Sequence, residues 1–282
     1  MSDRRKVLPQ YVMPKRGLTA FAGHVASRER GPTTTRLVRW FVRKYGVDMS
    51  EAAVADVAAY RSFNEFFTRA LKEGARPIAE ADLICPVDGT ISQFGRIEHD
   101  QILQAKGHRY STTALVGGDH DLAARFHDGS FATLYLSPKD YHRIHMPCDG
   151  TLTRMIHVPG SLFSVNPTTA RGVPGLFARN ERVVCVFDSP VVGTFVLTLV
   201  GATIVGSMAT VWHGAVRLPR VRRVREWHYA DAAIALKKGE EMGRFMLGST
   251  VVLLFPKSDL RFDPQWQPGG PVRLGQAMAE VG

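Results

Sequence analysis

The chain has 282 residues, enough for one large domain or for one domain with a small appendage. Hydrophobic residues make up 45% and charged residues 22%, which excludes a chain without a buried core. The 36 basic and 26 acidic residues give a formal net charge of +10, so the surface attracts polyanions, either nucleic acid or anionic lipid.

The opening segment does not read as a secretory signal, and the cysteine usage is consistent with a reducing compartment. Residues 1–17 carry charge but no apolar stretch of the kind that marks a secretory signal. The cysteines Cys85, Cys148 and Cys185 are odd in number and widely spaced, without a CxxC pair. We therefore interpret them as small buried hydrophobes rather than as catalytic thiols.

Two amphipathic helices are predicted near the N-terminus. Across 17–30 the apolar residues recur at helical spacing, and Pro32 ends that segment. Across 35–45 aromatic and aliphatic residues, among them Trp40 and Phe41, are interleaved with basic residues. The second helix either lies in a lipid interface, with its arginines on anionic head groups, or packs on its own domain with a solvated basic face. The pattern alone does not separate these alternatives.

A third helix is predicted shortly before residue 75. Ser62 and Glu65 have the spacing of a capping box. The helix is expected to continue through Leu71 and to end at Gly74 and Pro77.

After Pro77 the sequence changes to short β-type runs separated by Gly, Pro and Asp-Gly turns, which is typical of a sandwich or a barrel. We therefore expect an α+β chain, with a helical region at 1–75 and a β-rich domain at 76–282. The clearest strands are expected at 90–97, 131–136, 183–187, 195–200 and 251–255.

Residues 191–211 contain no charged side chain and are long enough to cross a bilayer as a helix. However, Gly193, Gly201 and Gly206 interrupt the stretch, and many of its other residues are β-branched. This composition favours buried strands joined by glycine turns over a membrane span.

A short pattern recurs along the β-rich part. PVDGTI at 86–91 returns as PCDGTL at 147–152 and, more loosely, as VWHGAV at 211–216. A turn followed by a strand, used repeatedly, suggests a duplicated β-unit, although Asp-Gly is also simply a common turn.

Three features carry residues suited to chemistry: Asp88 in PVDG, the pair His142 and His145 in YHRIHMP, and Ser249 in LGST. Each also has an ordinary interpretation. Asp88 could simply form a turn, His145 could be a hydrogen-bonded histidine of the core, and Ser249 could be a loop residue without a task. A zinc site completed by Asp88 or Asp149 is a further alternative, but no HExxH or CxxC accompanies the histidines, so we assign no metal. The residues alone give a Ser, a His and an Asp in unknown spatial relation.

The full set of motifs resembles the bacterial phosphatidylserine decarboxylase family, in order and over nearly the whole chain. The N-terminal stretches KYGVDMSEA and YRSFNEFFTRAL are also similar to that family. The motifs are PVDG at 86–89, ILQAKGHRYS at 102–111, YLSPKDYHRIHMPCDG at 135–150, GSLFSVNP at 160–167, LFARNERV at 176–183 and GEEMGRFMLGSTVV at 239–252.

The resemblance implies that the chain cuts itself between Gly248 and Ser249. Gly248 has no Cβ, so the serine oxygen is able to approach the preceding carbonyl. The family pattern assigns the base that removes the hydroxyl proton to His145, and the carboxylate that orients this base to Asp88. The resulting ester breaks by β-elimination and leaves a pyruvoyl group in place of Ser249. The products are a large β chain, 1–248, and a small α chain, 249–282.

The resemblance also implies the reaction. The amine of phosphatidylserine forms a Schiff base with the pyruvoyl group, which accepts electrons as pyridoxal phosphate does in other enzymes. After carbon dioxide departs, His142 is the expected proton donor to the α-carbon. Hydrolysis then releases phosphatidylethanolamine. The expected fold of the β-rich part is similar to duplicated barrel-sandwich hybrids.

A lipid substrate favours the interfacial alternative for the N-terminal helices, with contact at 18–45. We therefore expect peripheral attachment to the cytoplasmic side of the cell membrane, with phosphatidylserine and an anionic membrane surface as partners and no nucleic acid. The large and small chains are expected to stay together, either as one pair or as a dimer of two pairs. Five arginines that add to the basic surface, or form a solvated basic segment, are Arg217, Arg220, Arg222, Arg223 and Arg225.

Three rival functions remain open from the residues alone. A serine hydrolase would keep Ser249 as a permanent nucleophile and the chain intact, although GxSxG is absent. A lipid- or nucleic-acid-binding module would lose binding in salt and tolerate changes at Ser249. A zinc hydrolase would lose activity on chelation.

Overall fold

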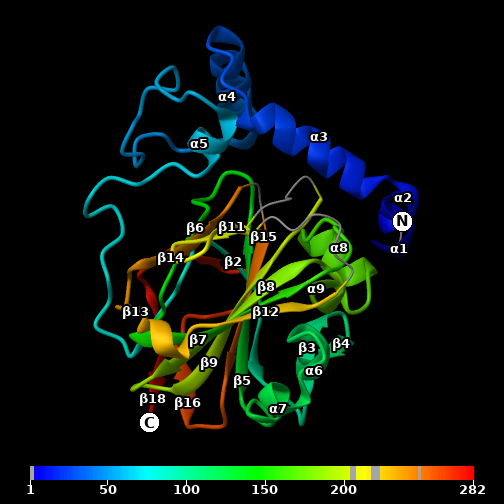
Figure 1. The fold of residues 1–282 in the computed structure, drawn as a ribbon, viewed down its shortest axis with the longest axis vertical. Coiled ribbons are helices and arrows are strands. Elements are labelled where there is room, and N and C mark those ends of the chain that lie inside the picture. Colours follow the sequence, from blue (N-terminus) through cyan, green and yellow to red (C-terminus); the bar gives the residue numbers. More distant parts are fainter. Residues whose placement is uncertain (1–2, 204–207, 217–222, 247–248) are drawn as a thin grey trace.

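The computed structural model describes residues 3–203, 208–216, 223–246 and 249–282, with only the backbone of Arg4, Arg16 and Ser249. Helices occupy the N-terminal part and strands dominate the rest (Figure 1), which confirms the α+β class expected from the sequence. In Figure 1, α3 runs across the top of the strands, and the C-terminus lies at the opposite end. The N-terminal helices are α1 (Asp3–Val7), α2 (Pro9–Val12), α3 (Lys15–Ser27), α4 (Pro32–Tyr45) and α5 (Phe63–Phe67).

The two predicted amphipathic helices are confirmed as α3 and α4. Together with α5 and the loop that precedes it, they enclose a hydrophobic core of their own. This core comprises Ala26, Val38, Phe41, Val47, Tyr60, Phe63, Phe66 and Phe67.

The third helix begins as predicted but is shorter than expected. The Ser62 hydroxyl accepts a hydrogen bond from the Glu65 amide, which caps α5. The helix ends at Phe67, and the residues that follow pair with an earlier segment, where Ala52 forms an antiparallel bridge with Leu71. The prediction of a helix through Leu71 was wrong, because this tertiary pairing competes with helical hydrogen bonding.

One nine-stranded sheet forms the centre of the β-rich part, with the order β12-β7-β8-β9-β15-β5-β2-β17 and β13 beside β7. Among the described residues its strands do not close into a barrel. The predicted strands are confirmed as β2, β5, β8, β9 and β15. The bounds are β2 (Gly89–Arg96), β5 (Ser130–Leu136), β7 (Gly150–Val158), β8 (Arg182–Ser189), β9 (Gly193–Val200), β12 (Arg225–His228), β13 (Ala235–Leu236), β15 (Ser249–Phe255) and β17 (Pro271–Val272).

The large sheet is buried on both faces. Successive residues of β8 alternate between two hydrophobic clusters: Val183 and Cys185 belong to one, and Val184 and Val186 to the other. This explains why the strands read as continuous apolar runs. In the uncharged stretch, the described residues form strands β9 and β10, and no helix in the described part of the chain is long and apolar enough to span a membrane.

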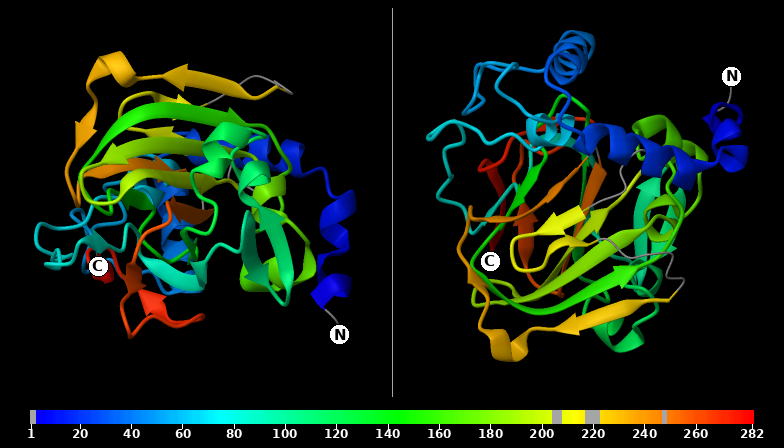
Figure 2. Two further views of the ribbon diagram at one scale, coloured as in Figure 1. Left: turned by 90° about the horizontal axis from the view of Figure 1, so that it is seen from below. Right: turned by 45° about the horizontal axis from the view of Figure 1, so that its top comes forward.

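Smaller elements cover the two faces of the large sheet (Figure 2). A four-stranded sheet, β11-β10-β14-β6, contributes to the first cluster, and short helices with β3 and β4 cover the second. The remaining strands are β1 (Leu83–Ile84), β3 (Gln101–Ala105), β4 (His108–Ser111), β6 (Arg143–His145), β10 (Met208–Thr210), β11 (Gly214–Val216), β14 (Glu241–Phe245), β16 (Leu260–Phe262) and β18 (Ala277–Val281). The remaining helices are α6 (Thr112–Leu115), α7 (His120–Ala124), α8 (Pro167–Gly172), α9 (Leu176–Arg179) and the 3-10 helix η1 (Ala230–Ala232).

The recurring sequence pattern corresponds to recurring structure. Gly89 begins β2, and Gly150 begins β7 at the equivalent position of the pattern. Both strands then have a register irregularity at the same offset, after Ile91 in β2 and after Leu152 in β7. A shared turn and a shared irregularity support a duplicated β-unit.

Candidate active site

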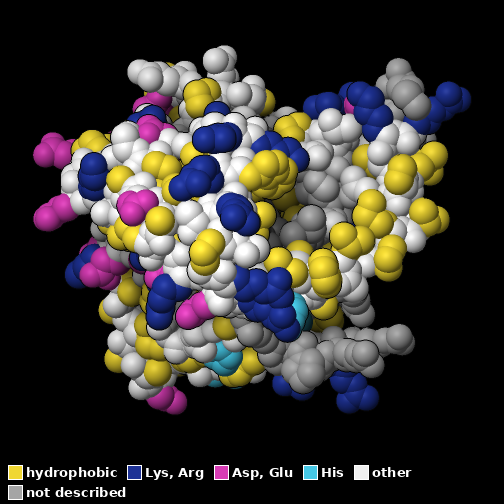
Figure 3. Space-filling model, turned by 90° about the horizontal axis from the view of Figure 1, so that it is seen from above, with side chains coloured by type: hydrophobic (Ala, Val, Ile, Leu, Met, Phe, Trp, Pro, Cys, Tyr) yellow, Lys and Arg dark blue, Asp and Glu magenta, His cyan; other side chains and the backbone are white. Residues whose placement is uncertain are grey.

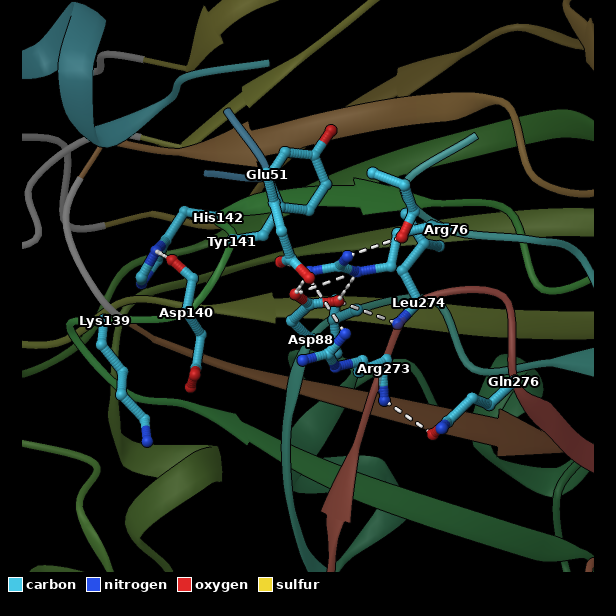
Figure 4. Close-up of polar contacts among 12 residues, drawn as sticks. Glu51, Arg76, Asp88, Lys139, Asp140, Tyr141, His142, Arg273, Leu274 and Gln276 are labelled. Atoms are coloured by element: carbon cyan, nitrogen blue, oxygen red, sulfur yellow. Dashed lines mark hydrogen bonds and ion pairs between the residues drawn. The ribbon is translucent and has the colours of Figure 1, made fainter. Parts of the chain in front are cut away.

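Asp88 lies in the turn before β2 and is held by an arginine. Its carboxylate accepts hydrogen bonds from Arg76 Nε at 2.9 Å and Nη2 at 2.5 Å, and from the Leu274 amide at 3.0 Å (Figure 4). Arg76 also donates to Glu51 at 2.7 Å, and Arg273 donates to the same glutamate at 3.0 Å. The Asp88 carboxylate, in a residue only 8% exposed, is therefore fixed by a network of charged side chains.

Gly89 allows the strand after Asp88 to approach β5 closely. A Cβ at this position would lie 2.4 Å from the Tyr135 carbonyl oxygen. Any side chain here would therefore push apart the two strands that position Asp88.

His145 ends β6, and two groups other than Asp88 hold its ring. Nδ1 donates to the Gly239 carbonyl at 2.8 Å, and the Tyr141 hydroxyl donates to Nε2 at 3.1 Å. A carbonyl only accepts hydrogen bonds, so it sets the tautomer: Nδ1 carries the proton and Nε2 is basic. Burial lowers the pKa of His145 below its ordinary value of 6.5, so the ring is neutral at pH 7.

The turn that carries Asp88 and the strand that carries His145 are nonetheless connected. The His145 amide donates to the Pro86 carbonyl at 2.9 Å, two residues before Asp88. Among the described residues Asp88 makes no hydrogen bond to the His145 ring; its charge acts through space and favours the protonated imidazole. In this state the Gly239 carbonyl, and not Asp88, is the partner of Nδ1.

His142 is fully buried just before β6. Its Nδ1 donates to the Asp140 carbonyl at 2.8 Å, and its ring lies 4.0 Å from the Phe67 ring between centroids. Its Nε2 has no hydrogen-bond partner among the described residues. Burial lowers the pKa of His142 to about 3, so the ring is neutral and its Nε2 is unprotonated. A buried polar atom without a protein partner is satisfied by a water molecule, a ligand or a reacting group.

The junction that contains the predicted cleavage site lies against the segment that carries these side chains. Gly248 and the Ser249 side chain are outside the described residues, but the Ser249 backbone begins β15 opposite Leu136 of β5. On the other side of the junction, the Phe245 amide donates to the His142 carbonyl at 3.0 Å. Both ends of the junction are thus fixed against the segment that runs from β5 to β6.

The structure adds residues that the sequence did not single out. They contact Asp88, His145 or the partners of these two, and they are Glu51, Arg76, Tyr141 and Gly239. Tyr141 lies inside the YHRIHMP motif, so its neighbourhood was visible in the sequence. Glu51 and Gly239 also lie inside the stretches KYGVDMSEA and GEEMGRFMLGSTVV, but the contacts themselves join residues far apart in the sequence and leave no local signal.

The structure also bears on the predictions for the three cysteines and the five arginines. The three cysteines are free and buried, as predicted. Arg223 and Arg225 are exposed, whereas Arg217, Arg220 and Arg222 lie outside the described residues.

Comparison with known proteins matches this chain to one family along most of its length. The family model described as "Phosphatidylserine decarboxylase" matches residues 63–280, and a second model, described as "PSD", matches residues 5–46. These matches identify the chain as a decarboxylase. More narrowly, it belongs to the phosphatidylserine decarboxylase family, as the resemblance of its motifs predicted.

Several relatives are similar over the full length. The chain is 73% identical to the phosphatidylserine decarboxylase proenzyme of Variovorax paradoxus (strain S110) over 281 residues, which cover 100% of this chain and 99% of the relative. It is also 73% identical to the proenzyme of Polaromonas sp. (strain JS666 / ATCC BAA-500), with 99% of each chain covered. The identity to the proenzyme of Dechloromonas aromatica (strain RCB) is 69%, over 99% of this chain and 98% of the relative.

Proposed function

We propose that this protein converts phosphatidylserine to phosphatidylethanolamine and carbon dioxide, with a pyruvoyl group that it makes from Ser249 by cutting its own chain after Gly248. The family match supports the reaction class. The observation that carries the local assignment is the junction before β15, which is fixed at both ends against the segment of His142. A proenzyme that cuts itself needs its scissile bond near a base, and this arrangement brings the junction to the segment that carries both histidines.

His145 is suited to the role of base in self-cleavage. Its Nε2 is unprotonated at neutral pH and is able to take the Ser249 hydroxyl proton once the Tyr141 hydroxyl moves away. Asp88, held by Arg76, then stabilises the protonated ring through space. Asp88 is therefore proposed as an electrostatic partner, with the tautomer set by the Gly239 carbonyl.

The proposed cleavage balances without an added reagent other than water. Ser249 Oγ attacks the Gly248 carbonyl carbon, the peptide C–N bond breaks, and the freed nitrogen takes the proton, which leaves an ester. β-Elimination removes the Cα proton and the Gly248 carboxylate and gives dehydroalanine. Tautomerisation to an imine and hydrolysis then release ammonia and leave the pyruvoyl group at residue 249.

The residues around the junction fit such a group, because the buried Nε2 of His142 has no partner among the described residues there. The pyruvoyl group supplies a carbonyl that captures the amine of the substrate and accepts the electrons released with carbon dioxide. His142 is proposed to return a proton to the substrate carbon. Because its pKa is about 3 in the free chain, this role requires the anionic substrate to raise that pKa on entry.

The small chain, 249–282, is proposed to stay bound after cleavage. Its strand β15 pairs with β5 on one side and β9 on the other, and Val251, Leu253 and Phe255 are fully buried. Its strand β18 pairs with β1 of the large chain. Separation would expose this apolar surface and break these hydrogen-bond ladders, which is strongly unfavourable.

Intact mass spectrometry with a decarboxylation assay tests the proposed function. Under denaturing conditions we expect two chains, 1–248 and 249–282, the smaller lighter by one ammonia than a serine start gives. Under native conditions the two masses should appear together, and the protein should release carbon dioxide from phosphatidylserine. A single full-length chain that stays uncut with lipid present, or an active protein with an intact Ser249, would contradict the proposal.

The N-terminal helices are proposed to dock on the cytoplasmic side of the cell membrane. Val12 is 87% exposed, Phe21 70% and Trp40 51%, although all three are large hydrophobic residues. In Figure 3 hydrophobic side chains gather along the projecting segment at the right, which is formed by α2 and α3, and Lys and Arg side chains lie beside them. Exposed rings next to basic side chains suit an anionic lipid interface, and the region 1–75 is proposed as this membrane-associating part.

Vesicle sedimentation tests the docking. We expect Phe21→Glu with Trp40→Glu to lower binding to phosphatidylserine-containing vesicles by about tenfold or more, since two rings no longer enter the interface. Val191→Glu, an exposed hydrophobic position in the turn between β8 and β9, serves as a control and should bind normally. Equal binding by the double variant and the control would rule out docking through α3 and α4.

A further inference from the structure

Arg69, just after α5, is a buried guanidinium without an ion-paired partner in the described part of the chain. The residue is only 5% exposed. Its Nη2 donates to the Lys139 carbonyl at 3.2 Å, but Nε and Nη1 have no hydrogen-bond partner among the described residues. Burial lowers the pKa of Arg69, yet a guanidinium stays charged at neutral pH. A buried charge of this kind is costly unless an anion pairs with it, so this position favours a partner that the free protein lacks.

Arg69 lines a cavity of about 300 Å³. The acidic residues in its wall are Asp48, Glu51, Asp88 and Asp140. Two of them pair with Arg76, and the other two accept hydrogen bonds from backbone amides. Asp88 and Asp140 favour the charge of Arg69 only through space. The cavity wall therefore includes a positive group whose Nε and Nη1 have no hydrogen-bond partner among the described residues.

The cavity lies at the end of the sheet where Ser249 begins. Lys139, whose carbonyl holds Arg69, comes three residues after Leu136, the register partner of Ser249.

Arg69 also lies close to His142, because adjacent residues of α5 support both side chains. The Arg69 guanidinium lies 5.5 Å from the centroid of the Phe66 ring, and the His142 ring packs on Phe67. The charge of Arg69 further lowers the pKa of His142. The two unpartnered groups are thus held near each other beside the junction.

We propose that Arg69 binds the phosphodiester of the phospholipid substrate and of the product. This assignment rests on the proposed function. The substrate carries two anions, a phosphate and a carboxylate. The carboxylate loses its charge as carbon dioxide leaves, so an arginine on it would stabilise the ground state more than the transition state and slow the reaction.

The phosphate, by contrast, keeps its charge throughout the reaction. A guanidinium donates charge-assisted hydrogen bonds to phosphate oxygens, and the two unpartnered donors of Arg69, Nε and Nη1, offer one such bond from each of two edges of its plane. Because Nε and Nη1 are covered in the free chain, the phosphate reaches them when side chains of the cavity wall move aside.

Binding of a soluble product lipid tests this inference without relying on turnover. Dihexanoyl phosphatidylethanolamine has the phosphate but no carboxylate. We expect calorimetry on the processed protein to show that Arg69→Met raises the Kd for dihexanoyl phosphatidylethanolamine about 30-fold. The reason is that the charge-assisted hydrogen bonds to the phosphate are lost. The KM for dihexanoyl phosphatidylserine should rise by a similar factor, while kcat stays the same or rises, because the lost charge no longer lowers the pKa of His142.

Two further variants make the outcome decisive. Arg61→Met, at an exposed position of the same segment, should leave the Kd unchanged. Arg69→Lys keeps the charge without the two guanidinium donors Nε and Nη1 and should raise the Kd about fivefold, so it decides the question if Arg69→Met does not fold. An unchanged product Kd in a folded, processed Arg69 variant overturns the inference, and so does a loss confined to kcat. An uncut or inactive wild type would instead refute the proposed function, while the Kd of the same lipid, measured on the chain as obtained, would still report on Arg69.

Discussion

A chain with Ser249→Ala is expected to remain one polypeptide of 282 residues and to form no phosphatidylethanolamine. Alanine has no hydroxyl to attack the Gly248 carbonyl, so neither the cut nor the pyruvoyl group is able to form. The effect is expected to be complete, because the same residue is needed for processing and, later, for the cofactor. Denaturing mass spectrometry and a carbon dioxide release assay on the same preparation measure both consequences.

Ser258→Ala provides a matched control in the small chain. Its hydroxyl donates a weak hydrogen bond of 3.4 Å to the Pro256 carbonyl and has no part in the proposed chemistry. This variant should be cut and active like the unaltered protein. Cleavage of the Ser249→Ala chain after residue 248 would remove the proposed mechanism altogether.

The two histidines are expected to separate the two reactions. His145→Ala should slow self-cleavage by about 10²–10⁴-fold, the usual contribution of a general base. His142→Ala should be processed at the normal rate, and its turnover should fall by a comparable factor because the substrate carbon loses its proton donor. Each variant is thus the control for the other. Time courses of cutting in newly made chains, followed by kcat of the processed protein, measure the two effects.

The rate of self-cleavage is also expected to depend on Asp88 and on pH. Asp88→Ala should also slow self-cleavage, but less than His145→Ala, because Asp88 acts on the ring through space and the Gly239 carbonyl still fixes the tautomer. Since burial lowers the pKa of His145 below 6.5, the rate of cutting should be level around pH 7 and fall only in more acid solution, as the imidazole is protonated. Normal processing in both the Asp88 and His145 variants would refute these roles, and full turnover in His142→Ala would refute the donor.

Local sequence accounts for much of this protein. Alternating or continuous apolar runs predicted β5, β8, β9 and β15, because a strand with one buried face repeats apolar residues with a period of two, and a strand buried on both faces is apolar throughout. Helical spacing in the same way predicted α3 and α4. The motifs around Asp88, His145 and Ser249 pointed to the family before any contact was known.

How these residues meet depends on the register of the sheet and on the loops that it brings together. The hydrogen bonds from Arg76 to Asp88 and from His145 to the Gly239 carbonyl are such contacts. The spacing of apolar residues along the sequence does not predict them. The early end of α5 has the same cause, since long-range pairing after it overrides a local helical preference. Arg69 is the clearest case: one more arginine in a basic sequence is recognisable as a binding residue only when its burial, its missing partners and the cavity beside it are known.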